Sequence, residues 1–392
     1  MMSYRARREL LAEVAPRYQS ARRDEKKRIL DEFVQITGYH RKYALNVLNH
    51  PEREERPKRR RRKRKYGANI IEPLVRLWRV ANCICGKRLV PFLAELISVL
   101  ERHSEIKLEA TVRELLLEIS AATVDRLLRP KRQGMKPRGM GTTKPGTLLK
   151  HQIPVRTFAD WTENKPGFLE IDLVAHCAFS TEGEYLHTLV LTDIYTTWTM
   201  CVALRHRSQQ QVSAAIDQVR QDLPFALLGL DSDNGAEFIN ANLLRYCQQH
   251  QITFTRSRPY KKNDQAHVEQ KNWTHVRQCV GYARYEGDAA YKALQALYEP
   301  LNLYMNFFQP TLKLIRKEQV AGHVRKTYDT AQTPYQRICG SEVVSEERKR
   351  ALRLLYETLN PAALLRQITR LQDQLWTLET VISTSEATLP SE

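Results

Sequence analysis

Hydrophobic residues recur at helical spacing through the first 50 residues of the chain. In the segment 22–38 the apolar residues share one helical face, and a glycine ends the pattern; they are Ile29, Leu30, Phe33, Val34, Ile36 and then Gly38. A second short amphipathic pattern follows over 39–49. Two helices joined by a tight turn predict a helix-turn-helix with 39–49 as the reading helix, and the alternative is an ordinary helical hairpin. The reading face would present His40, Arg41, Lys42 and Asn46.

The helical pattern resumes over 70–100 and again over 109–130, where Pro130 ends it. The second of these segments contains a capping sequence between two short helices, so it predicts a second helix-turn-helix. Its reading face would include Thr123 and Arg126. Residues 131–160 are rich in Gly, Pro and basic residues and predict a linker that follows DNA.

From residue 165 the pattern changes to apolar strands alternating with amphipathic helices. The expected strands are 167–177, 184–195, 197–206, 224–232 and 251–257, and the expected helices are 208–223, 236–250 and 263–282. The order β-β-β-α-β-α-β-α predicts a mixed, five-stranded α/β core of RNase H-like type.

The last third of the chain is predicted to be mostly helical. Leucines at helical spacing over 347–381 indicate a packing or oligomerisation face, and 312–329 could form a small strand pair. The resulting domain prediction is 1–52 helix-turn-helix, 53–66 basic linker, 67–130 second helical DNA-binding domain, 131–164 basic Gly/Pro linker, 165–310 catalytic core and 311–392 helical assembly region.

Charge supports a nucleic-acid partner for the first part of the chain. The net charge is +18, but residues 1–150 hold 36 Lys and Arg against 17 Asp and Glu, whereas the remainder holds 26 against 27. The excess is densest in 57–65, whose predicted DNA contacts are Arg59, Arg60, Arg61, Arg62, Lys63 and Arg64. Such a run is too dense for a solubilising helix face and gains free energy by releasing counterions from a phosphate backbone.

Other features of the composition exclude several classes of protein. No apolar run is long enough to span a bilayer, and the N-terminus lacks the apolar core of a secretory signal. Seven scattered cysteines indicate free thiols in a reducing cytoplasm without a disulfide framework. Cys83 and Cys85 have no second pair at zinc-finger spacing.

Acidic residues in the α/β region raise the question of catalysis. Asp172 lies inside an apolar strand, where an isolated carboxylate is costly unless it is paired or binds a metal. Asp231 and Asp233 end another apolar run in "LGLDSDNGAEF". A calcium loop does not fit, because positions six and twelve from Asp231 are Ala236 and Asn242. A plain surface turn would explain this stretch alone, but not Asp172.

The spacing and the amino-acid sequences of three motifs resemble those of the DDE transposase and retroviral integrase superfamily. Thirty-five residues separate Asp233 from Glu269, as in a D-D-35-E triad. "DSDNGAEF" is similar to the second motif of the superfamily, which selects Asp233, and "RPYKKNDQAHVEQKNW" is similar to the third. The strand "FLEIDLVAHC" corresponds to the first. The motif sequences are most similar to those of bacterial insertion-sequence transposases. The N-terminal His/Cys zinc module of retroviral integrases is absent from the sequence.

The resemblance implies a two-metal active site. Two Mg²⁺ ions, with Mn²⁺ as a substitute, would serve strand cleavage and strand transfer. Asp172 would bridge both ions, Asp233 would complete one and Glu269 the other. Such a site uses hard carboxylate oxygens and leaves the remaining positions to water and phosphate.

Weaker candidates surround the triad. Asn272, on the face of the Glu269 helix, could touch substrate, whereas Trp273 is expected in the core. Lys261 and Lys262 lie in the preceding loop and would meet phosphate or solvent. Asp193 is interpreted as structural.

These observations predict a transposase that binds terminal repeats and target DNA as double strands and works as a homo-oligomer, a dimer or larger. We expect it in the bacterial cytoplasm, associated with the nucleoid. The rivals are a metal-dependent nuclease without strand transfer and a DNA-binding regulator on an inactive core.

Overall fold

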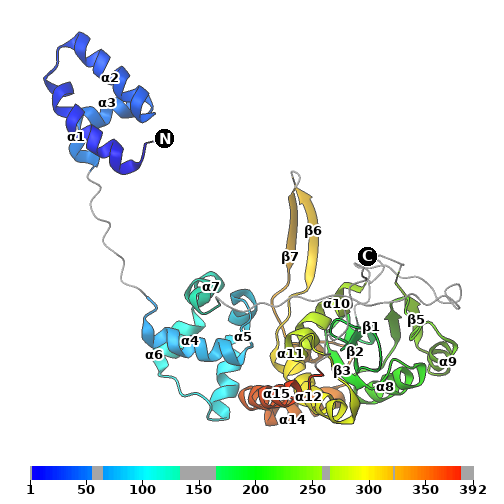
Figure 1. Ribbon diagram of the computed structural model, residues 1–392. Helices are drawn as coiled ribbons and strands as arrows, with labels where there is room; N and C mark the ends of the chain where they lie inside the picture. Colours follow the sequence, from blue (N-terminus) through cyan, green and yellow to red (C-terminus); the bar gives the residue numbers. More distant parts are fainter. Residues whose placement is uncertain (1, 55–64, 133–164, 258–264, 321–322, 381–392) are drawn as a thin grey trace, which may run out of the picture. The chain divides into compact units, whose positions relative to one another are not determined.

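The computed structural model describes residues 2–54, 65–132, 165–257, 265–320 and 323–380, in two compact units, Met1–Lys65 and Tyr66–Glu392. The first unit contains α1 (Tyr4–Ser20), α2 (Arg23–Thr37), α3 (Arg41–Asn49) and a 3₁₀ turn, Pro51–Glu54 (Figure 1). Its core lies among the three helices and includes Leu11, Phe33 and Leu48.

The first unit has the two helices and the tight turn that were predicted for it, and its assignment as a helix-turn-helix domain stays a prediction. Gly38 ends α2 in a left-handed conformation (φ 67°), and its N–H donates to the Val34 carbonyl at 2.9 Å. Because this conformation carries no Cβ penalty in glycine, the chain can reverse direction tightly before α3. Val47 and Leu48 of α3 are buried against the unit's core. DNA binding by this shape stays a prediction.

The second unit begins with four helices that share one hydrophobic core with the sheet that follows. They are α4 (Ala68–Val80), α5 (Gly86–Arg102), α6 (Ala110–Leu117) and α7 (Ala121–Leu128), followed by a 3₁₀ turn, Arg129–Arg132. At the start of α5, a Cβ on Gly86 would lie 2.3 Å from the Ala121 carbonyl oxygen. Glycine is therefore required for the close approach of α5 and α7. The segment predicted as a separate second domain thus packs within the larger unit.

The central sheet has the order β3-β2-β1-β4-β5. Its strands are β1 (Phe168–Ala175), β2 (His187–Asp193), β3 (Thr199–Leu204), β4 (Gly229–Ser232) and β5 (Thr253–Arg256). The pairs β1–β2 and β2–β3 are antiparallel, and β1–β4 and β4–β5 are parallel. This three-stranded meander followed by two parallel strands confirms the predicted mixed five-stranded, RNase H-like core.

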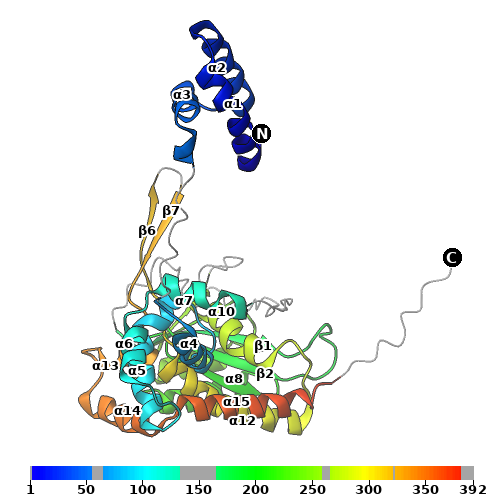
Figure 2. The same ribbon diagram turned by 90° about the vertical axis from the view of Figure 1, so that its left-hand side faces the viewer.

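Helices cover the sheet and fill the rest of the unit. They are α8 (Gln209–Asp222), α9 (Ala241–Gln249), α10 (Ala266–Lys271), the π-helical segment η5 (Asn272–Arg277), α11 (Gln278–Val280), α12 (Gly287–Phe308), α13 (Pro334–Cys339), α14 (Glu346–Thr358) and α15 (Pro361–Trp376). The long helices α12 and α15 lie side by side, as Figure 2 shows. Leu364, Ile368 and Leu375 of α15 are buried, so this part of the apolar stripe packs within the chain, whereas Leu354 of α14 is exposed. None of the described helices is both long and apolar enough to cross a membrane.

The free edge of the sheet at β3 is closed by two side chains of α12. Asn306 Oδ1 accepts from the Thr199 N–H at 2.8 Å, and its Nδ2 donates to the Thr199 carbonyl at 2.7 Å. One turn earlier, Asn302 makes the same pair of bonds with Cys201, at 2.9 and 3.1 Å. Side-chain amides thus replace the next strand of the ladder and satisfy backbone groups that an edge would leave open.

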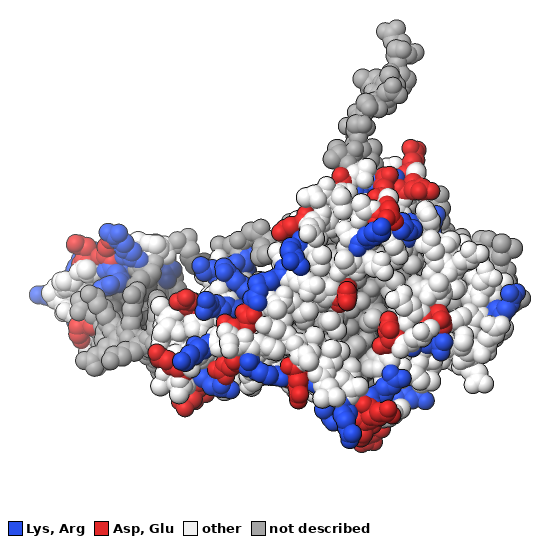
Figure 3. Space-filling model, turned by 90° about the horizontal axis from the view of Figure 1, so that it is seen from below, with Lys and Arg blue, Asp and Glu red and all other residues white. Residues whose placement is uncertain are grey.

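The predicted strand pair near 312–329 is present as a hairpin of β6 (Leu314–Val320) and β7 (His323–Tyr328). It projects from the second unit in both views (Figures 1 and 2). Surface charge elsewhere is mixed: on the face in Figure 3, Lys and Arg lie interspersed with Asp and Glu.

Candidate active site

Two of the predicted catalytic carboxyl groups lie on neighbouring parallel strands. The register pairs Ile171 of β1 with Ser232 of β4, so the next position along each strand holds Asp172 and Asp233. Asp172 is half-buried in β1, and Asp233 follows the last residue of β4. They lie at the carboxyl end of β4, where open α/β sheets commonly bind ligands.

The negative charges of the Asp172 and Asp233 carboxylates repel one another. Burial, together with the nearby carboxylates of Asp233 and Glu269, raises the pKa of Asp172 to about 7, although hydrogen bonds from Leu173 and Asn272 act to lower it. Burial likewise raises the pKa of Asp233 to about 6, against a bond from the Gly235 N–H at 2.8 Å. Crowded carboxyl groups of this kind favour a bound cation, because it would relieve their repulsion.

Glu269 lies on α10, the helix that packs against β1 and β2. Its side chain is exposed, and its charge acts on the pKa values of both Asp172 and Glu170. The helix is tied to β1 by two bonds. The Val268 N–H donates to Glu170 Oε2 at 2.8 Å, and Asn272 Nδ2 donates to Asp172 Oδ2 at 2.6 Å. Asn272 also begins the π-helical segment η5, a local irregularity that is frequent at functional sites.

Metal binding by the triad depends on how closely the side chains that the structure describes approach one another. Among them, no three or more His, Cys, Asp or Glu side chains lie close enough together to hold a metal ion. The donor chemistry of the Asp172 and Asp233 pair nevertheless fits Mg²⁺, which binds through one or two carboxylates and keeps several waters. One oxygen of Asp172 is occupied by the Asn272 amide. The buried oxygen Oδ1 of Asn272 has no hydrogen-bond partner among the described residues.

A second carboxyl pair, which the sequence interpretation missed, lies one step earlier on the same strands. Glu170 pairs in register with Asp231, and both are buried. Because side chains alternate along a strand, Glu170 shares a face with Asp172. Burial raises the pKa of Glu170 to about 8, with a further contribution from Asp231. Asp231 Oδ1 accepts from the Thr255 hydroxyl at 2.6 Å. An acid two residues before Asp172 in an apolar strand was the available signal.

The predictions for residues near the triad have different outcomes. Trp273, expected in the core, is instead 38% exposed, and that expectation was wrong. The π-helical segment shifts the helical register, so 3.6-residue spacing does not identify the buried face there. Asn272 does lie at Asp172. Lys261 and Lys262 fall outside the described residues.

Asp193 has the structural role that was expected. It is buried, and its Oδ1 accepts from the Gly167 N–H at 2.8 Å. Its Oδ2 accepts from both the N–H and the hydroxyl of Thr196, each at 2.6 Å. The group therefore shapes the turn between β2 and β3.

Most of the predicted DNA-contacting side chains in the described residues are exposed. In the first unit these are His40, Arg41, Lys42 and Asn46, and Arg41 forms an ion pair with Asp31. In the second unit Arg126 is exposed, whereas Thr123 is half-buried and bonded to Ser120 at 3.0 Å. The basic run 59–64 falls outside the described residues.

Comparison with known proteins places this core in a family. The integrase core domain family matches residues 163–262. The uncharacterized protein y4rM of Sinorhizobium fredii (strain NBRC 101917 / NGR234) is 43% identical over 339 residues, which cover 86% of this chain and 96% of y4rM.

Two solved structures are also similar to part of the chain. The catalytic core domain of BIV integrase is 19% identical, with a TM-score of 0.29, over 43% of this chain and 91% of that one. A simian T-cell lymphotropic virus intasome in complex with PP2A regulatory subunit B56 gamma is 14% identical, with a TM-score of 0.26, over 46% and 59%. From the family match and the motifs on the sheet, the chain belongs with y4rM to one family within the DDE transposase and retroviral integrase superfamily.

Proposed function

We propose that this protein is a DNA transposase that cuts and joins strands at the ends of a mobile element. The observation that carries the proposal is the pair of crowded carboxyl groups, Asp172 and Asp233, on adjacent parallel strands. Asn272 connects this pair to the helix that bears Glu269. A purely structural core has no need for mutually repelling carboxyl groups at the end of its sheet.

Phosphodiester cleavage without a covalent protein intermediate needs an activated oxygen nucleophile and a stabilised leaving oxygen. Two divalent cations, held by Asp172, Asp233 and Glu269, would supply both. The chain's own contribution is orientation. Leu173 and Asn272 each donate to one oxygen of Asp172 and fix its plane, and the Gly235 N–H does the same for Asp233. Glu269 would complete the donor set from the exposed side of α10.

The first unit would recognise the terminal repeats. Lys42 and Asn46 of α3 and the preceding His40 are exposed, as a reading helix requires. The basic run 57–65, at the end of this unit's sequence, would add affinity that does not depend on the DNA sequence. Because two element ends must be processed together, we infer that the protein assembles on DNA as a dimer or larger oligomer.

The test uses labelled duplexes taken from the DNA that flanks the coding sequence, together with target DNA and Mg²⁺. Wild-type protein should produce strand breaks and joined product. Asp172→Asn, Asp233→Asn and Glu269→Gln should each abolish both products while keeping the wild-type circular dichroism spectrum. Asp222→Asn, at an exposed carboxylate at the end of α8, is the matched control and should remain active.

Each rival function has its own outcome in the same assay. A wild-type protein that nicks the labelled ends but never joins them would identify a nuclease. A protein that binds the ends and leaves every strand intact would identify a regulator on an inactive core. Retained activity in all three acid variants would show that the triad is assigned wrongly.

A further inference from the structure

The β6–β7 hairpin exposes side chains that proteins usually cover. Every residue of β7 is exposed. Large apolar side chains lie along the arm in contact with solvent: Ile315 is 67% exposed, Val324 54% and Tyr328 47%. A two-stranded ribbon has no core of its own and is only marginally stable in isolation. Apolar groups on such a ribbon therefore indicate a binding surface.

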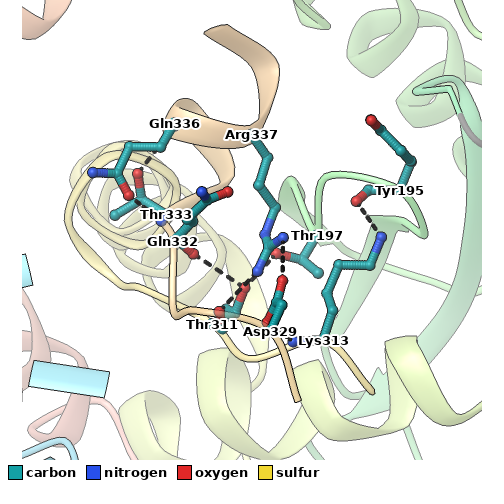
Figure 4. A network of polar contacts seen from close by, with 9 residues as sticks. All are labelled: Tyr195, Thr197, Thr311, Lys313, Asp329, Gln332, Thr333, Gln336 and Arg337. Atoms are coloured by element: carbon teal, nitrogen blue, oxygen red, sulfur yellow. Dashed lines mark hydrogen bonds and ion pairs between the residues drawn. The ribbon is translucent and has the colours of Figure 1, made fainter. Parts of the chain in front are cut away.

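The base of the arm, in contrast, is held firmly in the second unit. Lys313 and Asp329, which flank the hairpin, bond to each other twice: the Lys313 N–H donates to Asp329 Oδ1 at 2.7 Å, and the Asp329 N–H donates to the Lys313 carbonyl at 3.0 Å. Arg337 of α13, itself buried to nine-tenths, donates to Asp329 Oδ2 at 2.7 Å and to the Thr311 carbonyl at 2.9 Å. Figure 4 shows the Arg337 side chain pointing toward Asp329 and Thr311.

The same network joins the arm to the catalytic sheet. Lys313 Nζ donates to the Tyr195 carbonyl at 2.6 Å, and the hydroxyls of Thr197 and Thr311 lie 2.9 Å apart (Figure 4). Tyr195 and Thr197 belong to the turn between β2 and β3 that Asp193 shapes. The arm therefore starts from a fixed point on the unit that carries Asp172, and its direction is set by that unit.

Charge indicates what the arm binds. The two strands carry four basic residues, Arg316, Lys317, Arg325 and Lys326, against one acidic residue, Glu318. Arg316 forms an ion pair with Glu318, whereas Arg325 and Lys326 are exposed on opposite faces of β7. The excess of basic residues on the two strands would attract the phosphates of DNA.

We propose that the β6–β7 hairpin is a DNA-binding arm that lies in a groove of a duplex held by the second unit. A two-stranded ribbon fits the major groove, basic residues reach phosphates, and apolar side chains contact base edges and sugars. This inference rests on the proposed function for its substrate, but it assigns a binding surface outside the acidic site.

The first test measures contact directly in the full-length chain. A photoreactive phenylalanine analogue replaces Tyr328 or Val324 in an Asp172→Asn background, which prevents cutting. The control carries the analogue in place of Leu354, a 61% exposed residue of α14. On irradiation with labelled flanking duplex, both hairpin positions should cross-link to DNA well above the Leu354 control. Cross-linking no stronger than this control, or only to a second protein chain, would overturn the proposal.

The second test separates the arm from the basic N-terminal region. The triple variant Arg316→Gln, Arg325→Gln, Lys326→Gln should bind duplex DNA less tightly and show a salt dependence weaker by up to about 3 in the log–log slope. A matched triple variant, Arg348→Gln, Arg350→Gln, Arg370→Gln, removes exposed charges of α14 and α15 and should lower the slope by less. Equal slopes in the two triple variants would contradict DNA binding by the β6–β7 hairpin.

The two proposals can fail separately. If the triad variants lose strand joining and the hairpin does not cross-link to DNA, the transposase proposal is supported and the proposed DNA-binding role of the hairpin is wrong. If the hairpin cross-links to DNA but the triad variants stay active, the DNA-binding role of the hairpin is supported and the catalytic assignment is wrong.

Discussion

At the scale of single residues, the site depends on how Asp172 is oriented. Its carboxylate receives one bond from its own strand, through Leu173, and one from Asn272 across the gap to η5. Partners that orient a ligand in this way commonly contribute 10- to 100-fold to affinity or activity. Asn272 is therefore a positioning residue for Asp172.

Replacing Asn272 with alanine should lower the rate of strand joining by roughly 10-fold or more without unfolding the protein. The carboxylate would lose its fixed plane, so a higher Mg²⁺ concentration should be needed for half-maximal rate. The measurement is a titration of joining rate against Mg²⁺. Gln278→Ala, at an exposed position two turns further along, is the control. An unchanged Mg²⁺ requirement in Asn272→Ala would contradict this role.

A second residue-scale prediction concerns pH and stability. Burial, and then the positive charge of Arg207, lower the pKa of His187 from 6.5 to about 4. Since the folded chain keeps this ring neutral while the unfolded chain takes up a proton, His187 reduces the free energy of unfolding as pH falls from 6.5 to about 4. Between these limits the loss attributable to the ring should be on the order of 2 kcal/mol.

The measurement is urea unfolding of wild type and His187→Gln between these pH values. The buried carboxyl groups with raised pKa values have the opposite pH dependence, because their contribution to the free energy of unfolding falls as pH rises. The difference between the two proteins isolates His187. His323→Gln, at an exposed position in β7, should follow wild type. Parallel profiles for His187→Gln and wild type would contradict the burial account.

How far the site could be predicted also depends on single residues. Asp172, Asp233 and Asn272 were predicted as site residues because a carboxylate in an apolar strand and a spaced motif are visible in the sequence, and the structure places Asn272 at Asp172. Glu170 was missed although it lies two residues from Asp172, because its partner Asp231 is known only once the strand register is fixed. Sequence spacing could not place Trp273, since η5 departs from the α-helical period.

At the scale of elements, the sheet was predictable because its alternation of strands and helices is unambiguous. Ends were predicted less well: β4 begins at Gly229 although the apolar run begins at Pro224. Hydrophobicity marks burial, but strand pairing is decided by the neighbouring backbone. No periodicity predicts that α12 closes the β3 edge through amide side chains, because polar residues usually indicate a solvated face.

This edge closure gives a stability prediction. Asn306→Ala should leave the Thr199 N–H and carbonyl unpaired in a buried setting, which costs roughly 2 kcal/mol or more. Chemical denaturation should show the lower free energy of unfolding. Lys292→Ala, at an exposed position on the same helix, should change it by less than about 0.5 kcal/mol. Equal stability of the two variants would show that the amide does not close the edge.

At the scale of the whole molecule, we propose that the first unit, whose sequence ends in the basic run 57–65, binds DNA, and that the second unit, which contains Asp172, Asp233 and Glu269, carries out catalysis. Charge asymmetry predicted a DNA-binding front, and the motifs predicted the core. The sequence did not predict that residues 66–132 share a hydrophobic core with the sheet. That sharing depends on long-range contacts, such as the Tyr304 hydroxyl bond to the Val80 carbonyl at 2.5 Å, which local patterns do not encode.

The central claim is that Asp172, Asp233 and Glu269 together hold divalent cations for strand chemistry. It is tested most directly by calorimetric titration of Mg²⁺ into the full-length protein bound to an uncleaved end duplex. Wild type and Asp222→Asn should bind the cation, whereas Asp172→Asn, Asp233→Asn and Glu269→Gln should each bind it at least about 10-fold more weakly, a difference of about 1.4 kcal/mol. Mg²⁺ binding of equal strength in all five proteins would contradict the account.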